Sequence, residues 1–402
     1  MLPVDEQLHV ISSGTAAIHT VESLTEKLRG GRRLRIKLGV DPTAPDLHLG
    51  HAVPLRKLRQ FQDLGHEVVL IIGDYTALIG DPSGRNSTRP ALTIEQIDAN
   101  AETYIEQAFH ILDPDATELR RNSEWLAPLD FAKLLQLTSE FTVARILERD
   151  DFSNRYTKQQ PISLHELLYP VAQSYDSVVV RADVEIGGTD QLFNLLAGRD
   201  LMGRLDMEPQ VALTLPLLEG TDGVQKMSKS YGNYIGLTDA PDDMFGKVMS
   251  IPDVLMVKYY RLATPVAVDE IDRLERALAE GAEHPNAVKR RLAREIVALY
   301  RGSEAAIEAE EAFDRVFKRG EAPADIPEVC LVLTEPVYLP GLLKDLGLVA
   351  SANEGRRQID QDAVRIDGAP VSPGTYEVSR GVVEGAVVQV GKRRYARPVS
   401  IV

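Results

Sequence analysis

The chain has 402 residues, a formal net charge of −15 and one cysteine, and it is 44% hydrophobic and 26% charged. This is the composition of a globular protein with room for two or three domains, and it excludes an internal disulfide or a cysteine-rich metal site. No apolar run approaches the roughly 18 residues of a membrane span, and the N-terminus has no basic region followed by an apolar block. We therefore expect a cytoplasmic protein with no membrane segment and no signal peptide.

The charge is unevenly distributed along the chain. Residues 341–402 carry nine Lys/Arg and seven Asp/Glu, a net charge of +2, so the remainder carries −17. The acidic body argues against a broad nucleic-acid surface, whereas a basic tail can bind an acidic polymer locally.

The first part of the chain alternates between predicted strands and helices. Residues 1–35 are expected to be helical. The apolar stretches 35–40 and 66–74 are predicted strands, and a helix that ends near Leu64 lies between them. Strand, helix and strand at this spacing indicate a parallel sheet with helices packed on it.

The pattern is then interrupted and resumes. Thr93 and Gln96 form a capping box for a helix that runs to about residue 111. Residues 112–160 resemble an inserted, mostly helical segment. A helix over 163–176 and a strand over 178–188 continue the sheet.

The second half of the chain predicts separate parts. A strand within 211–220 closes the sheet, and residues 240–318 are expected to be helical throughout. Residues 319–329 have the proline and small-residue content of a linker. Two short helices and several strands are predicted after Pro340, with a tight hairpin at Asp367-Gly368.

The turn after the first strand, "DPTAPDLHLGH", places two histidines at the start of a helix. Pro54 fits best in a first helical turn, so the helix should begin near Leu49, with free N–H groups close to His48 and His51. A helix N-terminus of this kind binds phosphate, and Gly50 allows a flat ring to lie against the backbone. Either histidine alone is as readily a surface or core residue, and a zinc site would lack a third ligand.

A second segment, "KMSKS", combines two lysines and two hydroxyls. It spans Lys226–Ser230 and is flanked by Gly220, Gly223 and Gly232, so a mobile cationic loop is expected. Taken alone, such a loop is most often merely solvated. Because both segments follow strands of the same predicted sheet, together they can clamp a triphosphate from two sides.

The predicted helix 163–176 carries a polar stripe. Tyr169, Gln173 and Asp176 are spaced i, i+4 and i+7, so they share one face, while leucines and valines surround them. The stripe is either a solvent face or the wall of a pocket for a small polar ligand.

These motifs resemble those of class I aminoacyl-tRNA synthetases. "HLGH" is similar to their His-Ile-Gly-His signature, and "KMSKS" matches their second signature letter for letter. "YPVAQSYD" is similar to the Tyr-x-x-x-Gln-x-x-Asp element of tyrosyl-tRNA synthetases, and "LIGDPSGR", "NSEW" and "GGTDQ" resemble further elements of that family. The tail "LLKDLGLVASANEGRRQIDQDAVRIDG" is similar to a small RNA-binding fold shared with a ribosomal protein. Tyrosyl enzymes of bacteria carry this tail and tryptophanyl enzymes do not.

The resemblance implies an α/β fold in four parts. A Rossmann-like parallel-sheet catalytic domain would span residues 1–238, with a helical insertion at about 112–160 through which the family usually forms a homodimer. An all-helical tRNA- and anticodon-binding domain would follow at 239–318, then a linker at 319–336. A small α+β RNA-binding domain of ribosomal-protein type would occupy 337–402.

The resemblance also implies a tyrosine site. Tyr169, Gln173 and Asp81 would hold the ammonium group of the substrate, and Asp176 would accept a hydrogen bond from its phenol. Lys37 stands where many bacterial members have tyrosine, so it is expected to pair with Asp176 or to donate to the phenol. Glu185 likewise replaces a common glutamine. The implied tyrosine-binding residues are Lys37, Asp41, Thr76, Asp81, Tyr169, Gln173, Asp176 and Gln191.

The same resemblance implies an ATP site beside the tyrosine. Asp190 would bind the ribose hydroxyls, Gly50 and His51 would pack near the nucleoside, and Thr43 and His48 would hold the γ-phosphate. The implied ATP-binding residues are Gly39, Asp41, His48, Gly50, His51, Gly188, Asp190, Met227, Ser228 and Lys229.

A carboxylate is already ionised at neutral pH, so the reaction that the resemblance implies needs no general base. Its catalytic groups should be positioners and charge stabilisers. The implied set is Thr43, His48, His51, Lys226, Lys229, Arg85 and Arg89. No protein-held metal is expected, because Mg²⁺ would arrive with the ATP phosphates.

The implied partners are ATP, L-tyrosine and tRNA(Tyr), and the candidate RNA contacts are Arg290, Arg291, Arg294, Arg356, Arg357, Lys392 and Arg393. Each of these cations is as readily a solvated surface residue. Three other interpretations stay open: a tryptophanyl-type synthetase, a nucleotidyltransferase with the same histidine chemistry, and a non-enzymatic RNA-binding descendant of a synthetase. The tail and the Tyr-Gln-Asp stripe argue against the first, and the intact signatures argue against the last.

Overall fold

A computed structural model of the chain describes residues 2–81, 92–318, 326–391 and 394–401. The chain divides into two compact units, residues 1–306 and 307–402, and each is described by itself. Within the described ranges, no helix combines the length and the apolar character needed to cross a membrane.

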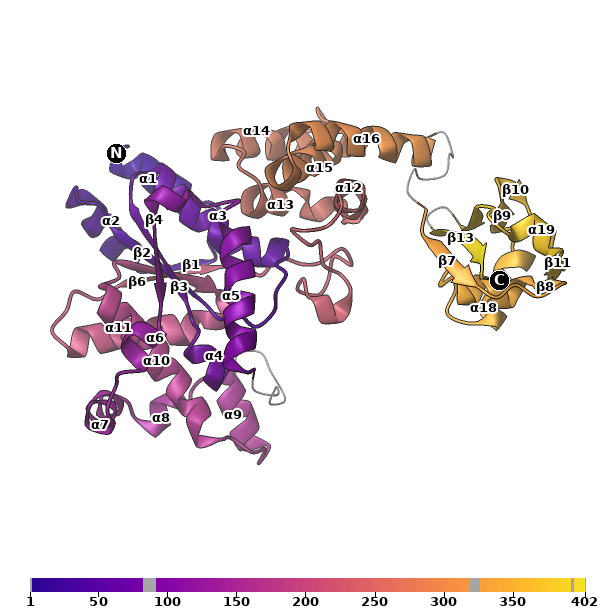
Figure 1. Cartoon of the computed structure of the whole chain (residues 1–402). Helices are drawn as coiled ribbons and strands as arrows, with labels where there is room; N and C mark the ends of the chain where they lie inside the picture. The colour runs from indigo at the N-terminus through magenta and orange to yellow at the C-terminus, as the bar shows by residue number, and fades with distance from the viewer. Residues whose placement is uncertain (1, 82–91, 319–325, 392–393, 402) are drawn as a thin grey trace. The chain divides into compact units, whose positions relative to one another are not determined.

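The larger unit is built around a six-stranded sheet of order β1-β6-β5-β2-β3-β4 (Figure 1). Five strands run parallel, as the alternation of strands and helices predicts. These are β2 (Arg35–Val40), β3 (Glu67–Ile72), β4 (Thr117–Arg121), β5 (Val184–Gly188) and β6 (Val211–Leu215). The sixth strand, β1 (Ala17–His19), lies antiparallel against β6 at the edge.

The strands on the two sides of β2 come from different parts of the chain, and this arrangement determines where the site lies. From β2 it crosses through α3 (Leu49–Asp63) to β3 on one side, while β5 pairs with β2 on the other. The point between β2 and β5 is therefore a topological switch point, where open α/β sheets bind ligands beyond the carboxyl ends of their strands. The helix α3 begins at Leu49, as the placement of Pro54 predicts.

Helices connect the strands of the larger unit and pack around its sheet. The predicted capping box of Thr93 and Gln96 is present at the start of α5 (Ile94–Ala108). The other helices of this part are α1 (Val4–Ser12), α2 (Val21–Arg29), α4 (Thr76–Ile79), α6 (Ser123–Leu126), α7 (Phe131–Ser139), α8 (Val143–Ile146), α9 (Asp150–Thr157), α10 (Tyr169–Val180) and α11 (Leu192–Arg204), with a 3-10 turn at Leu164–Leu168.

Three expectations about the sheet need correction. The stretch 1–35 contains the strand β1 between two helices, and the segment 112–160 contributes the strand β4. Both are edge strands of few residues that are only partly buried, so they lack the apolar run that marks a central strand. The stretch 178–180 ends α10, and Arg181 in the left-handed conformation (φ 51°) terminates that helix before the strand begins.

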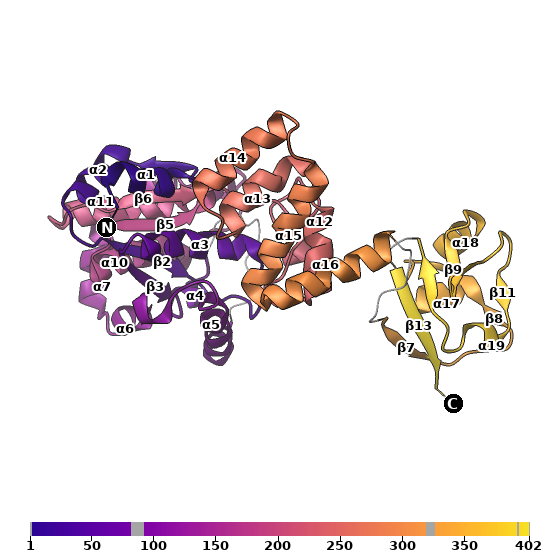
Figure 2. The same ribbon diagram turned by 90° about the horizontal axis from the view of Figure 1, so that it is seen from above.

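Residues 240–318 are helical, as predicted. The elements are α12 (Pro241–Ser250), α13 (Met256–Ala263), α14 (Val268–Ala279), α15 (Pro285–Arg301) and α16 (Ser303–Lys318). Figure 2 shows α12 to α15 grouped beside α3. Tyr259 and Tyr260 are fully buried within this group, and their hydroxyls donate to the backbone carbonyls of Glu219 and Val288.

The smaller unit has its own core and a five-stranded sheet of order β10-β9-β12-β13-β7. Its strands are β7 (Glu328–Leu331), β9 (Val364–Ile366), β10 (Ala369–Pro370), β12 (Val388–Val390) and β13 (Arg394–Ser400), beside a separate pair, β8 (Val337–Tyr338) and β11 (Glu377–Val378). The helices α17 (Leu339–Asp345), α18 (Ala352–Asp360) and α19 (Arg380–Val383) pack with them.

Two sequence predictions for this unit have different outcomes. The hairpin is confirmed, because Asp367 (φ 47°) and Gly368 (φ 79°) both adopt the left-handed conformation that a type I′ turn requires. The linker predicted over 319–336 is too long, because β7 lies within it and pairs in parallel with β13.

Candidate active site

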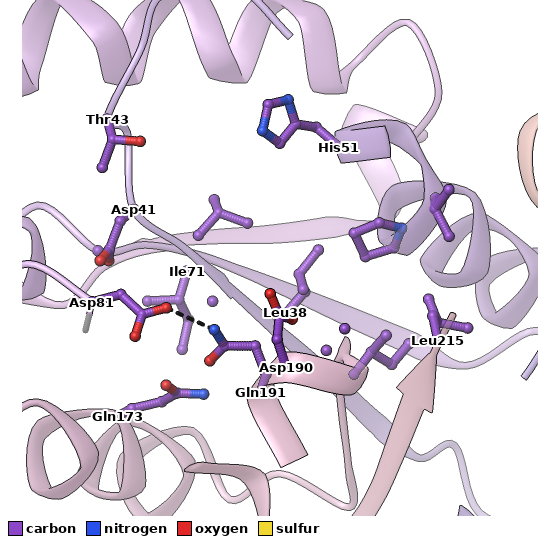
Figure 3. Close-up of a pocket in the computed structure, with 18 of the residues that line it drawn as sticks. Leu38, Asp41, Thr43, His51, Ile71, Asp81, Gln173, Asp190, Gln191 and Leu215 are labelled. Atoms are coloured by element: carbon purple, nitrogen blue, oxygen red, sulfur yellow. Dashed lines mark hydrogen bonds between the residues drawn. The ribbon is translucent and has the colours of Figure 1, made fainter. Parts of the chain in front are cut away.

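A cavity of about 310 Å³ opens at the carboxyl ends of β2, β5 and β6 (Figure 3). The turn before α3 and the polar stripe of α10 form two of its walls. The stripe is therefore a pocket wall, which resolves the alternative of a solvent face. Thirteen of the residues predicted for the site line this cavity: Gly39, Asp41, Thr43, Gly50, His51, Thr76, Asp81, Tyr169, Gln173, Asp176, Gly188, Asp190 and Gln191.

Asp41, at the end of β2, is held by two hydroxyl groups. It accepts hydrogen bonds from Thr76 Oγ1 at 2.7 Å and from Tyr169 Oη at 3.0 Å. A Cβ on Gly73 would lie 2.2 Å from the Asp41 carboxylate and 2.3 Å from Thr76 Oγ1, so only glycine fits there. Burial raises the pKa of Asp41 to about 7, and the charges of Asp81 and Asp176 act in the same direction.

Asp176 is a buried residue of the cavity lining. Its carboxylate accepts hydrogen bonds from Trp125 Nε1 at 2.8 Å and from Asn122 Nδ2 at 3.4 Å, both from the "NSEW" element. Burial raises the pKa of Asp176 to about 6, whereas the positive charge of Lys37 lowers it. These two donors hold the carboxyl group of Asp176 in a fixed orientation in the cavity lining.

Lys37 is not among the lining residues of the cavity. Its ammonium group donates to Ser177 Oγ at 2.7 Å, to Glu185 Oε1 at 2.8 Å and to the backbone carbonyl of Gln173 at 3.0 Å. Lys37 therefore forms its ion pair with Glu185. The predicted alternative, a pair with Asp176, is wrong. The reason is register, since Lys37 on β2 stands directly opposite Glu185 on β5. A contact with a bound phenol stays a prediction.

His48 and His51 lie at the start of α3 with their rings stacked, 3.8 Å between centroids. Burial lowers the pKa of His48 to about 3 and that of His51 to about 4, and the charge of Lys229 acts in the same direction. Both imidazoles are thus neutral at physiological pH. A Cβ on Gly50 would lie 3.0 Å from the His48 ring and 3.6 Å from Met227 Cβ, so a larger residue here would crowd the histidine ring.

The structure brings the "KMSKS" segment and the residues that follow it against the histidine turn. Leu49 N donates to Ile235 O at 3.0 Å, Leu237 N donates to Leu47 O at 2.9 Å, and His48 bridges Gly236. The side chain of Lys229 reaches the Asp46 carboxylate at 3.1 Å. The two segments, far apart in sequence, therefore lie side by side. The histidine turn lines the cavity through Gly50 and His51, whereas His48 and the segment 226–229 lie outside its lining.

Asp81 and Asp190 complete the acidic wall. Asp81 accepts hydrogen bonds from Gln191 Nε2 at 2.7 Å and from Arg149 Nη2 at 2.9 Å, and the first of these is drawn in Figure 3. Burial raises the pKa of Asp190. Sequence reasoning did not identify Arg149, nor Tyr104 and Gly73 of the lining, because none stands in a recognisable motif. Two predicted catalytic residues, Arg85 and Arg89, lie outside the described residues.

Comparison with known proteins decides the family. The family of class I tRNA synthetases (W and Y) matches residues 29–318. The tyrosine–tRNA ligase of Moorella thermoacetica is 52% identical over 398 residues, which cover 98% of this chain and 96% of that protein. The tyrosine–tRNA ligase of Desulfotalea psychrophila is 51% identical over 404 residues, 99% of each chain. The chain belongs to the tyrosine–tRNA ligases.

Solved structures of the tyrosine–tRNA ligase family share the fold. The crystal structure of tyrosyl-tRNA synthetase complexed with L-tyrosine from Archaeoglobus fulgidus matches with a TM-score of 0.63 at 24% identity, over 77% of this chain and 99% of that one. The enzyme from Aeropyrum pernix matches with a TM-score of 0.61 at 21% identity, over 79% and 99%. The tyrosine–tRNA ligase relatives match from end to end, which favours this family over the tryptophanyl-type, nucleotidyltransferase and non-enzymatic alternatives.

The predicted RNA contacts in the helical segment each have a partner within the protein. Arg291 pairs with Glu270 at 2.6 Å, and Arg290 Nε donates to Asn286 at 3.2 Å. Arg294 also has a partner.

In the smaller unit, Arg356 and Arg357 are exposed on α18. The Arg356 guanidinium lies 5.7 Å from the ring centroid of Tyr338 and 5.3 Å from that of Tyr376. Lys392 and Arg393 lie outside the described residues.

Proposed function

We propose that this protein activates L-tyrosine with ATP and then transfers the tyrosyl group to the 3′ end of tRNA(Tyr). One observation carries the proposal: a single cavity is lined both by the Trp125-bonded carboxyl of Asp176 and by Gly50 and His51 at the start of α3. The carboxyl suits the phenol of a hydroxylated aromatic side chain, and the start of α3 with the nearby "KMSKS" lysines suits a triphosphate.

The cavity favours an amino acid with a phenol at one end and an ammonium group at the other. Asp176 accepts the phenol hydrogen bond, while Tyr169, Gln173 and Asp81 receive the ammonium. The buried Oε1 of Gln173 has no hydrogen-bond partner among the described residues, so an acceptor is available there. Phenylalanine would leave Asp176 without its phenol partner, and a buried polar group left unpaired costs about 1–3 kcal/mol.

In the first reaction the tyrosine carboxylate attacks the α-phosphorus of ATP, and pyrophosphate leaves with its Mg²⁺. Charge builds on the leaving phosphates, so donors placed there accelerate the reaction. Thr43, His48, Lys226 and Lys229 supply these donors. Because the histidines are neutral, His48 acts as a hydrogen-bond donor and the lysines carry the positive charge.

In the second reaction a ribose hydroxyl of the tRNA attacks the carbonyl carbon of the mixed anhydride, and AMP leaves. Arg290, Arg291 and Arg294 in the helical part, and Arg356 and Arg357 in the tail, provide the RNA contacts. The catalytic domain would end near residue 238, and the helical tRNA-binding domain would follow to residue 318. The segment 112–160 would pair two copies in a cytoplasmic homodimer.

Amino-acid-dependent ATP–pyrophosphate exchange tests this proposal. We expect exchange with tyrosine and, at equal concentrations, none above background with phenylalanine or tryptophan. Exchange that prefers tryptophan, or that is absent with all three amino acids, would contradict it.

A further inference from the structure

Four side chains close a hydrogen-bonded ring at the edge of the cavity. Arg149 Nη2 donates to Asp81 Oδ1 at 2.9 Å, and Gln191 Nε2 donates to Asp81 Oδ2 at 2.7 Å. Asn194 Nδ2 donates to Gln191 Oε1 at 2.9 Å, and Arg149 Nη1 donates to Asn194 Oδ1 at 3.0 Å. Each oxygen of the Asp81 carboxylate therefore has a separate donor, which fixes both its position and its rotation.

The ring has an inner half and an outer half. Asp81 and Gln191 line the cavity, whereas Arg149 and Asn194 do not. The Arg149 side chain is 4% exposed, and its Nε pairs with Asp151 at 2.7 Å. Asn194 is also buried. The outer pair thus holds the inner pair without access to a bound amino acid.

The charge of the cavity explains why a buried arginine stands here. Four carboxylates line the cavity, those of Asp41, Asp81, Asp176 and Asp190, and no described lining residue is lysine or arginine. The negative charge of Asp81 raises the pKa of Asp41 and of Asp190, whereas the charge of Arg149 lowers that of Asp190. The buried guanidinium therefore offsets the mutual repulsion of these carboxylates and holds Asp81 in place beside them.

We propose that Arg149 and Asn194 are positioning residues, which hold Asp81 and Gln191 in the orientation that receives the ammonium group of the substrate amino acid. This inference rests on the proposed function. The planar guanidinium is essential to it, because Arg149 must donate to Asp81 and Asn194 at once; a lysine supplies a point charge but not this fork.

Three variants and one matched control test the role. Arg149→Gln removes the cation, Arg149→Lys keeps the charge without the fork, and Asn194→Leu breaks the ring on its other side. Arg155→Gln is the control, since Arg155 is a similarly enclosed arginine in α9 that pairs with Glu166 at 2.5 Å and is not a member of the ring. Each variant is measured in pyrophosphate exchange for the KM and kcat of tyrosine. Inhibition constants are measured for tyramine, which keeps the ammonium, and for 3-(4-hydroxyphenyl)propionate, which lacks it.

For Arg149→Gln and Asn194→Leu we expect the tyrosine KM and the tyramine inhibition constant to rise by about 10- to 100-fold. The constant for 3-(4-hydroxyphenyl)propionate and kcat should change by less than about threefold, because neither depends on the ammonium contact. Arg149→Lys should lie between the wild type and Arg149→Gln, and Arg155→Gln should match the wild type.

Equal weakening of both analogues would overturn the inference, as would a loss in Arg155→Gln as large as in Arg149→Gln. An unchanged tyrosine KM in Asn194→Leu would do the same. Equilibrium binding of tyramine by calorimetry repeats the comparison without turnover. If the ring variants weaken tyramine binding but the wild-type protein shows no tyrosine-dependent exchange, the proposed function is wrong, while the positioning role of the ring still holds.

Discussion

The ammonium nitrogen of Lys37 lies 2.8 Å from Glu185 Oε1, and the two side chains are 0% and 1% exposed. The residues stand opposite each other on neighbouring parallel strands, beneath the helix that carries Gln173 and Asp176. Each departs from the pattern of the family that the sequence resembles, and the structure shows that the two departures form one ion pair. Because Glu185 neutralises the charge of Lys37, Asp176 is not needed as its ion-pair partner. The Asp176 carboxylate instead accepts hydrogen bonds from Trp125 and Asn122.

Lys37→Met should destabilise the larger unit by about 3–5 kcal/mol, because it leaves the buried Glu185 carboxylate without its counter-charge. The double variant Lys37→Met/Glu185→Gln should regain most of that loss. Denaturant unfolding can be followed by the fluorescence of Trp125, the single tryptophan of the chain, which is buried in this unit. A single variant that loses less than about 1 kcal/mol would show that the pair is not structural.

Tyrosine affinity should depend on pH through Asp41, whose pKa is raised to about 7 by burial. In the free, folded protein Asp41 stays protonated from the ordinary pKa range of an aspartate up to about pH 7. The folding stability that this bound proton contributes is therefore lost as the pH rises toward 7. Binding of an ammonium group favours the ionised carboxylate. Calorimetry between about pH 5.5 and 8 should therefore show affinity falling up to about tenfold per unit below pH 7.

Asp41→Asn is the control for this pH dependence. It should remove the dependence near pH 7, while the contribution of Asp176, whose pKa is about 6, should remain. Affinity in the wild type that stays flat from about pH 6 to 8 would contradict the assignment.

His48 should act as a neutral hydrogen-bonding group, because its pKa is lowered to about 3 by burial and by the nearby charges. His48→Ala should reduce the single-turnover rate of adenylate formation by roughly 10²–10³. His48→Gln, which keeps a neutral donor, should lose clearly less. Equal losses in the two variants, or a wild-type rate that titrates near pH 6.5 through this histidine, would show that its charge matters.

The sequence predicts the centre of the fold better than its edges. Strand β3 is an apolar run that is buried from Val68 to Ile72, β2 is buried at 36–38, and the start of α3 follows from Pro54. The edge strands β1 and β4 are short and partly polar, so no periodicity marks them. The valines 178–180 favour a strand locally, but in the structure they end α10, which packs on α11.

The candidate site likewise contains residues that the sequence predicts and residues that it does not. The motifs predict thirteen of the residues that line the cavity, because the types and spacing of those residues reflect the proposed chemistry. The residues behind them, Arg149, Asn194 and Glu185, act through contacts between segments more than 40 residues apart in sequence, or across a strand register. A linear pattern does not contain that information.

Removal of residues 326–402 should impair tRNA charging far more than pyrophosphate exchange. This boundary removes the whole sheet of the smaller unit, including β7, and keeps the larger unit intact. Charging should fall by at least about tenfold at physiological salt as phosphate contacts are lost, while exchange stays within about twofold. A parallel loss of both activities would indicate that the tail supports the structure of the larger unit.

The most direct test of the account is the single-turnover rate of tyrosyl-adenylate formation in Lys229→Ala, titrated with tyrosine at saturating ATP. The lysine contacts Asp46 beside the histidine turn and lies outside the amino-acid cavity. We expect the maximal rate to fall by roughly 10²–10³ while the dissociation constant of tyrosine stays within about twofold. A normal maximal rate combined with weakened tyrosine binding would contradict the placement of the leaving phosphates between these two segments.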